Sequence, residues 1–384
     1  MTIPEINTVC FVGAGTMGCY NALAAAVSGY QVVLYDANAE SLERIPQVQA
    51  ELATMLVGGG YCTEEDIRRA LSRTRVSADL ADATAEADLV SESVFEDKQL
   101  KRKVHAKLDQ CCLAHTILTS NSSGLLVSDI EDAVERGDRF AALHSHLGAP
   151  LVDIVPGPRT TAETVDILRR YVLSIKGEPL VLQKENPGYL LNAMLGSVIG
   201  TSLALWARGD YSIDEIDAAW MLSQDAIMGP FGMVDLFGLP LVRDTWLHRG
   251  RDDALQVYRG DIVGALESRL AQGKQGMKSG AGFYSYPDPA YQASGFATQS
   301  RDSQVAKILR ATLIAHGVIL AVDEIAEPAD IDRAWRIGTH LTQGPFQLLD
   351  ESSREEVEID LQQLQELALL DSADASRVRG WLQQ

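Results

Sequence analysis

The apolar positions of the N-terminal part follow two different periods. Short apolar runs, which are typical of buried strands, occur at residues 8–12, 31–35, 88–92 and 116–120. Helical periodicity fills much of the intervals, at residues 39–57, 63–73 and 98–108. Strands that alternate with helices indicate a parallel, doubly wound sheet covered by helices. We therefore predict an α/β domain over residues 1–185.

The pattern changes after Asn186-Pro187-Gly188, where leucine, alanine and helical periodicity take over. A Gly- and Pro-rich connector at residues 274–302 interrupts this helical region. We predict a helical domain over residues 186–290 and a second, duplicated helical domain over residues 291–384.

The duplication is visible as an internal repeat with a constant offset of 115 residues. Three short motifs recur at this offset without an insertion: residues 216–220 and 331–335, residues 229–231 and 344–346, and Asp235 and Asp350. A constant offset over several motifs indicates a repeated structural unit. The predicted fold is therefore a doubly wound α/β domain followed by an all-α region of two helical modules.

Composition and charge limit the partners of the protein. Hydrophobic residues make up 46% and charged residues 22%, which is typical of a folded globular chain. The formal net charge of −20 disfavours nucleic acid and anionic membranes, since both require a positive field. No leader pattern is recognised, and no uninterrupted apolar stretch approaches a bilayer span. The five cysteines show no disulfide or metal-site spacing, so we expect a cytoplasmic protein without a metal.

The first apolar run leads directly into the glycine-rich turn GAGTMG, and the second ends at Asp36. A Gly-x-Gly-x-x-Gly turn between a strand and a helix, with an acid after the next strand, is the fingerprint of a dinucleotide-binding Rossmann-type domain. Gly13 permits the tight turn, Gly15 lets backbone amides approach the pyrophosphate, and Gly18 lets the helix pack on the strand. The positive end of the helix dipole binds the anion, so the acidic net charge is no obstacle.

Asp36 favours NAD over NADP. Its carboxylate can accept hydrogen bonds from the ribose hydroxyls and would repel a 2′-phosphate. The predicted cofactor-binding residues in this part of the chain are Gly13, Ala14, Gly15, Thr16, Met17, Gly18 and Asp36.

Seven motifs, in order along residues 8–285, resemble those of the 3-hydroxyacyl-CoA dehydrogenase family. They lie at residues 12–18, 87–96, 119–123, 139–144, 186–192, 228–231 and 278–284. The segment PLVDIVP at residues 150–156 is closer to a branch of the same superfamily that acts on free acids, the L-gulonate (λ-crystallin-like) and carnitine dehydrogenases. The resemblance implies an NAD-dependent oxidoreductase.

The resemblance also implies a histidine–carboxylate pair. His144 matches the histidine that takes the proton of the substrate hydroxyl, a task that suits an imidazole titrating near neutral pH. The family places a glutamate on the following strand, and Asp153 is expected to take that role here. The loop HSHLGAP after His144 is shorter than the family's. With a different gap Pro156 falls on the acid position and the pair is absent, and His146 is an alternative base.

Further site residues are implied by the same resemblance. Ser123 and Asn192 match positions that hydrogen-bond the substrate oxygen and the histidine, although Ser123 could instead cap a helix starting near Leu125. Glu96 and Lys101 match positions near the nicotinamide, with a solvated helix-start pair as the alternative. Asn121 is predicted to contact the cofactor as well.

The substrate is open between two classes. The family majority favours a 3-hydroxyacyl-CoA, with fatty acid metabolism as the setting. Between residues 37 and 67, however, the only cation is Arg44, which disfavours an anionic CoA tail unless Arg68, Arg69 and Arg73 face it. The alternatives are a small free hydroxy acid, gulonate- or carnitine-like, and an inactive NAD-binding structural or regulatory protein.

The repeat bears on assembly. Two-domain members of the resembled family dimerise through the helical domain, and a second copy in the same chain can replace that contact. The second module has Lys307 where the first has Asn192, so it is predicted to be a pseudo-dimer partner and not a second active site. We expect a monomer with an internal pseudo-dimer of helical modules, or a homodimer.

Overall fold

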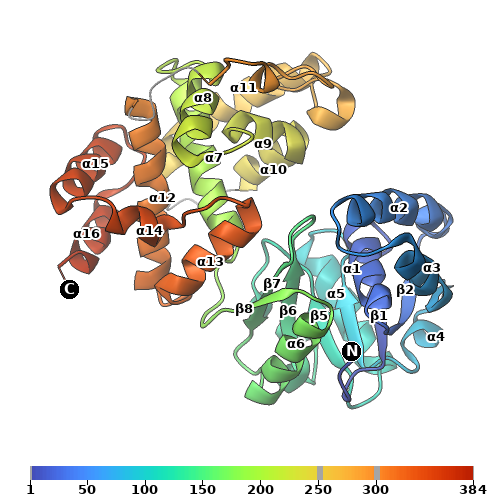
Figure 1. Cartoon of the computed structure of the whole chain (residues 1–384). Coiled ribbons are helices and arrows are strands. Elements are labelled where there is room, and N and C mark those ends of the chain that lie inside the picture. Colours follow the sequence, from blue (N-terminus) through green and yellow to red (C-terminus); the bar gives the residue numbers. More distant parts are fainter. Residues whose placement is uncertain (1, 249–253, 298–302, 384) are drawn as a thin grey trace. The chain divides into compact units, whose positions relative to one another are not determined.

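The computed structural model describes residues 2–248, 254–297 and 303–383, and the chain forms two compact units, Met1–Tyr189 and Leu190–Gln384 (Figure 1). The first unit is an α/β domain and the second is helical. The two helical modules predicted from the repeat lie in one unit.

The N-terminal unit is built on one eight-stranded sheet with the strand order β3-β2-β1-β4-β5-β6-β7-β8. Its strands are β1 (Thr8–Val12), β2 (Gln31–Tyr35), β3 (Thr74–Ser77), β4 (Leu89–Glu92), β5 (Ile117–Ser120), β6 (Phe140–Ser145), β7 (Leu151–Pro156) and β8 (Glu178–Val181). The first six strands are parallel, as predicted. The pair β6–β7 is antiparallel, because the five residues between them are too few for a helical crossover.

Helices cover both faces of the sheet: α1 (Thr16–Val27), α2 (Ala39–Gly58), α3 (Glu64–Ser72), α4 (Leu80–Thr84), α5 (Lys98–Cys111) and α6 (Ala162–Ser174). Apolar side chains of α1, α2, α3 and α6 share one buried cluster with the strands. The remaining helices, α4 and α5, contact each other and the sheet. The predicted Rossmann-type doubly wound architecture is confirmed.

The C-terminal unit consists of helices α7 (Leu191–Ala207), α8 (Ile213–Gln224), α9 (Pro230–Phe237), α10 (Leu239–His248), α11 (Arg259–Ala271), α12 (Gln304–Val322), α13 (Pro328–Thr339), α14 (Pro345–Asp350), α15 (Arg354–Glu366) and α16 (Ser372–Trp381). Short 3₁₀ turns lie at Val127–Asp129, Glu131–Ala133, Gly137–Arg139, Ala254–Tyr258, Met277–Ser279 and Ala290–Gln292. Among the described residues no strand occurs after β8, so this unit has the all-α character that the periodicity predicts.

The two modules repeat the same local structure. Asp217 on α8 accepts the Phe231 and Gly232 amides at the start of α9, at 2.9 and 3.1 Å. Asp332 on α13 accepts the corresponding amides of α14, from Phe346 and Gln347, at 2.8 and 3.1 Å. A carboxylate at a helix N-terminus satisfies amides that have no partner within the helix. The repeated motifs therefore carry a repeated helix cap.

The repeated tryptophans meet inside the unit. Trp220 and Trp335 are fully buried, and their rings lie edge to face with 6.2 Å between centroids. Helices α7 and α12, which precede the two motifs, also pack against each other. This pairing of equivalent elements agrees with the predicted pseudo-dimer of modules.

Helix α12 is the one described helix that is long and apolar enough to cross a membrane by length and composition. In its most apolar window 67% of the helix is buried inside the unit, against α7, α8, α13, α14, α15 and α16. This burial is typical of the central helix of a bundle.

Candidate active site

The glycine turn joins β1 to α1 at the carboxyl edge of the sheet. A Cβ atom on Gly18 would lie 1.8 Å from the Gly13 carbonyl oxygen, and one on Gly13 would lie 2.6 Å from the Ser93 carbonyl oxygen. Gly13 also has φ of +102°, which favours glycine. Around Gly15, by contrast, no described atom other than those of Gly15 itself and its neighbours along the chain lies within 4 Å of a Cβ position. Two of the glycines therefore serve the packing of the turn, and the third leaves space beside the helix N-terminus.

That space fits the pyrophosphate of a dinucleotide. It lies between β1 and β4, where the strand order changes direction, which is where nucleotides bind in such sheets. Asp36 follows β2 at the same edge, and its two carboxylate oxygens accept the Ala14 and Asn38 amides, each at 2.8 Å. Asp36 is partly exposed, so its remaining lone pairs are available to ribose hydroxyls. Thr16 and Met17 open α1 beside this space.

A matched pair of substitutions separates these glycine roles. We expect Gly15→Ala to leave the thermal unfolding midpoint close to that of the wild type and to weaken NAD binding, because its methyl group enters only the cofactor space. We expect Gly18→Ala to lower the midpoint as well, because its methyl group meets backbone. Differential scanning fluorimetry and NAD titration measure the two effects. Unchanged NAD affinity in Gly15→Ala would show that the cofactor lies elsewhere.

His144 and Asp153 lie directly opposite each other on β6 and β7. The Nδ1 atom of His144 lies 3.0 Å from Oδ2 of Asp153, and Asp153 is fully buried. The predicted pair is therefore formed, and the alignment that puts Pro156 in the acid position is wrong. Because an ionised carboxylate only accepts hydrogen bonds, Nδ1 carries the hydrogen and the Nε2 atom of His144 is left with its lone pair.

Burial and hydrogen bonding set the charges of this pair. Burial lowers the pKa of His144, and its hydrogen bond with Asp153 opposes that effect only in part. Burial alone would raise the pKa of Asp153, but the hydrogen bonds from His144 and His146 outweigh it and hold this pKa below its ordinary value. At neutral pH the histidine is therefore a neutral base beside an anionic carboxylate.

A second histidine contacts the same carboxylate. His146 lies just beyond β6, and its Nε2 atom is 2.9 Å from Oδ2 of Asp153. The rings of His144 and His146 lie edge to face, with 4.4 Å between their centroids. The short turn after β6, closed by a hydrogen bond from the Ala149 amide to the His146 carbonyl, keeps both histidines on one side of the hairpin. This turn thus brings a second imidazole to the Asp153 carboxylate.

A buried ionic network lies at the carboxyl end of β4. Lys101 of α5 is 1% exposed, and its Nζ atom lies 2.7 Å from Oε1 of Glu92 and 3.4 Å from Oε2 of Glu96. Glu92 ends β4, is fully buried, and is also hydrogen-bonded to His105 at 3.2 Å and Ser120 at 2.7 Å. The alternative of a solvated Glu96–Lys101 pair is therefore wrong for the lysine. Its ammonium contacts Glu92 and Glu96, and the predicted part of Glu96 and Lys101 in cofactor binding stays a prediction.

Glu92 and His105 were not among the residues predicted from the sequence. The signal for Glu92 was an acid at the carboxyl end of an otherwise apolar strand, because dinucleotides bind at this edge of such sheets. His105 lies inside the α5 pattern, and nothing in the sequence distinguished it from a core histidine.

Glu96 organises the loop after β5. Its Oε1 atom accepts the Ser122 hydroxyl and the amides of Gly124 and Leu125, the latter two at 2.9 and 3.3 Å. Ser122 in turn accepts the Leu125 amide at 3.0 Å. The alternative in which Ser123 caps a helix near Leu125 is therefore wrong, since Ser122 makes that bond and the next 3₁₀ turn starts only at Val127.

Ser123 is exposed in this loop, which leaves its hydroxyl accessible. Asn121, at the start of the loop, accepts the Ser145 amide on its Oδ1 atom at 2.9 Å. This bond fixes the loop after β5 to the end of β6, next to His144. Asn192 lies in the first turn of α7 in the C-terminal unit and is partly buried, and its proposed part in catalysis stays a prediction.

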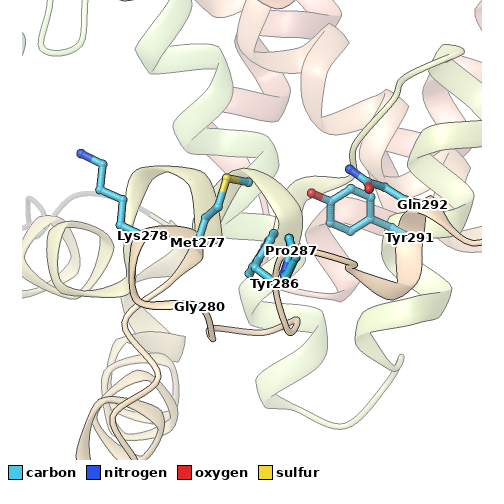
Figure 2. A pocket seen from close by; sticks show the side chains of 7 residues that line it. All are labelled: Met277, Lys278, Gly280, Tyr286, Pro287, Tyr291 and Gln292. Atoms are coloured by element: carbon cyan, nitrogen blue, oxygen red, sulfur yellow. The ribbon is translucent and has the colours of Figure 1, made fainter. Parts of the chain in front are cut away.

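The second unit has a surface pocket of about 420 Å³ in the Gly- and Pro-rich connector (Figure 2). It is lined by Met277, Lys278, Gly280, Tyr286, Pro287, Tyr291 and Gln292. Figure 2 shows Lys278, its only charged residue, extending away from the tyrosines. Asp235 anchors this connector by accepting the Phe283 and Tyr284 amides at 2.7 and 2.8 Å. The residues that line this pocket include no histidine or carboxylate, whereas the first unit holds the His144–Asp153 pair.

Comparisons with known proteins match both parts of the chain to one family. A family model described as the NAD binding domain of 3-hydroxyacyl-CoA dehydrogenase matches residues 8–186. The C-terminal domain model of the same family matches residues 188–286. The human mitochondrial hydroxyacyl-coenzyme A dehydrogenase is 31% identical over 298 residues, which cover 73% of this chain and 91% of that protein.

Two solved structures extend the comparison. A diketoreductase, studied for its action on dicarbonyl compounds, is 30% identical, with a TM-score of 0.68 over 74% of this chain and 100% of that one. A 3-hydroxybutyryl-CoA dehydrogenase from Escherichia coli is 21% identical, with a TM-score of 0.78 over 97% of this chain and 98% of that one. The second likeness concerns the fold, and it includes the second helical module.

Proposed function

The chain belongs to the 3-hydroxyacyl-CoA dehydrogenase family, and from this premise we propose that it oxidises a 3-hydroxyacyl-CoA to the 3-oxoacyl-CoA with His144 as the general base. The family assignment makes it an NAD-dependent oxidoreductase. NAD, when bound, accepts the hydride that leaves the carbinol carbon. The residues of the chain bind the cofactor, orient the substrate and move one proton.

The geometry of the histidine pair carries the proposal. With Nδ1 held by Asp153 at 3.0 Å, the Nε2 atom of His144 is the group that accepts the hydroxyl proton. The Asp153 carboxylate then stabilises the imidazolium and keeps the ring in one orientation. In the reverse direction the same imidazolium returns the proton to the alkoxide.

Two neutral groups are proposed to assist. The exposed hydroxyl of Ser123 can donate a hydrogen bond to the substrate oxygen, which gains negative charge as its proton leaves. Asn192 is proposed to take part in catalysis as well, because it matches a position that has this role in the resembled family. Neither group competes for the proton that His144 takes.

A small free hydroxy acid is the second candidate substrate, and the surface charges favour it. Arg68 and Arg69 of α3 face solvent and pair with Glu65 and Asp66 at 2.6 and 3.0 Å, so part of their charge is already compensated. Arg44 is exposed on α2, in an acidic stretch of the chain. An anionic CoA tail would find few free cations there. The diketoreductase relative acts on dicarbonyl compounds, which supports a substrate without CoA.

A substrate panel tests the proposal. Purified protein with NAD is mixed with 3-hydroxyacyl-CoA esters of several chain lengths, gulonate and carnitine, and the absorbance of NADH is followed. We expect the highest kcat/KM for a CoA ester. Turnover of only free acids would identify the second candidate, and NAD binding without any turnover would indicate an inactive binding protein.

The assembly and location follow from the same premise. The buried contact of Trp220 with Trp335 supports a chain that satisfies its helical pairing internally, so we propose a monomer. Sedimentation velocity would detect a homodimer. We also propose a cytoplasmic location, since all five cysteines are free thiols.

A further inference from the structure

The hairpin β6–β7 brings together three side chains that can ligate a metal ion. His144, His146 and Asp153 each offer one ligand atom, and these atoms lie within 4.8 Å of one another. Two imidazoles and one carboxylate are a ligand set for divalent ions such as Zn²⁺, Fe²⁺ or Co²⁺ and disfavour Mg²⁺ and Ca²⁺, which prefer oxygen ligands. We propose that Zn²⁺ or a similar divalent transition-metal ion binds at His144, His146 and Asp153 and blocks the general base.

The spacing of the three groups supports this site. Both imidazole nitrogens approach the same carboxylate oxygen, at 3.0 Å from His144 and 2.9 Å from His146. Tetrahedral zinc bonds of about 2.0–2.2 Å separate neighbouring ligand atoms by roughly 3.3–3.6 Å. The two nitrogen–oxygen distances are slightly shorter than this, and all three ligand atoms lie within 4.8 Å of one another, so the side chains must rearrange around the ion but already converge on one point.

The hairpin register explains why these three residues converge. His144 lies directly opposite Asp153, and the tight turn places His146 at the diagonal position two residues on. Side chains in direct and diagonal pairs across antiparallel strands are within reach of each other when they are long.

An unused lone pair adds an independent observation. Asp153 is fully buried, and within the described part of the chain its Oδ1 atom has no hydrogen-bond partner. An unsatisfied buried carboxylate oxygen is costly and marks a place where a cation would be stabilised. His146 retains 10% exposure, so an ion can approach the cluster from its side.

Metal binding would switch off the base by relocating a hydrogen. In the pair with Asp153, His144 carries hydrogen on Nδ1 and has its lone pair on Nε2. When an ion binds Nδ1 of His144, the hydrogen of the neutral ring moves to Nε2. In His146 the ion binds Nε2, and the ring hydrogen moves from Nε2 to Nδ1. No net proton is released, but Nε2 of His144 can no longer accept the proton of a substrate hydroxyl.

The experiment measures metal binding directly. The full-length protein is freed of metals with a chelator and titrated with Zn²⁺ by calorimetry, and Co²⁺ is used as a spectroscopic probe of the coordination geometry. We expect one ion per chain and no comparable binding of Mg²⁺. In His146→Gln we expect affinity to fall by roughly 100-fold or more, since losing even an outer-shell partner costs roughly 10–100-fold.

Two variants control this result. His146→Gln keeps an N–H donor for Asp153, so NAD binding and the unfolding midpoint serve as checks that the variant is folded. His115→Gln is the matched control, because His115 pairs with Asp88 at 3.0 Å but has no second histidine and is 55% exposed. Equal affinity in wild type and His146→Gln, or an equal loss in His115→Gln, would overturn the site.

Inhibition by Zn²⁺ is a second measurement, and it rests on the proposed function. On any substrate that is turned over, Zn²⁺ should inhibit the wild type reversibly, with recovery on adding chelator, and should inhibit His146→Gln far less. Full activity with the site saturated would overturn the block of the base. If no substrate is turned over while Zn²⁺ still binds at these residues, the proposed function fails and the metal site stands.

Discussion

Replacing His144 with glutamine should lower kcat by roughly 10²–10⁴-fold, the range that a positioned acid–base group contributes. Glutamine has a similar reach and can still hydrogen-bond Asp153, but it cannot accept the proton of the substrate hydroxyl. The NAD dissociation constant should stay close to that of the wild type, because the glycine turn and Asp36 bind the cofactor. Steady-state rates and a separate NAD titration measure the two quantities.

The pH profile adds a second readout of the same substitution. Because burial lowers the pKa of His144, the wild type should keep its oxidation rate down to a pH below the ordinary histidine range and lose it as the ring becomes protonated. The residual rate of His144→Gln should lack this acidic limb. The variant His146→Gln replaces the other histidine that contacts Asp153. Comparing its pH profile with that of His144→Gln shows which histidine is responsible for the acidic limb. If only His146→Gln removed the limb, His146 would be the base.

Much of the N-terminal fold follows from local patterns. Each parallel strand is a short apolar run, and each crossover helix has its own periodicity, so strands and helices could be located without knowledge of their partners. The antiparallel pairing of β7 depends on the five-residue turn after β6 and on the register with β6. Register is a property of two strands together, and the sequence of one strand does not specify it.

The site divides in the same way. Gly13, Gly18 and Asp36 act through backbone geometry close to them in sequence, and their roles could be predicted. The role of Asp153 depended on where the gap after His144 was placed, and the structure shows that Asp153 contacts His144. Glu92 is hydrogen-bonded to residues 9, 13 and 28 positions away, so its role appears only when three elements are packed together. His146 was predicted only as an alternative base, because residues two apart share a face only along a continuing strand and β6 ends at Ser145.

The ionic network beneath the site leads to the largest expected change in stability. Lys101→Met should lower the free energy of unfolding by about 3–5 kcal/mol, the usual result of removing one partner of a buried ion pair. Glu92 would then be a buried carboxylate without its cation, and Glu96 would lose its ion pair with the Lys101 ammonium. Urea denaturation at neutral pH measures the loss. Lys98→Met is the matched control on the same helix, since Lys98 is 47% exposed in its pair with Asp129 and should contribute about 1 kcal/mol or less.

The pH dependence of stability tests the same network with a defined sign. Burial alone would raise the pKa of Glu92, but the His105 hydrogen bond and the charge of Lys101 hold it at about 2, below its ordinary 4.5. This group therefore stabilises the wild type above pH 4.5 and loses that contribution as the pH falls toward 2. Lys101→Met should raise the pKa of Glu92, so its stability deficit should shrink on acidification. Adding Glu92→Gln should recover part of the loss at neutral pH, because the uncompensated charge is gone. A deficit that is equal at all pH values and is not relieved by Glu92→Gln would mean that Lys101 contributes packing of its aliphatic stem and not charge.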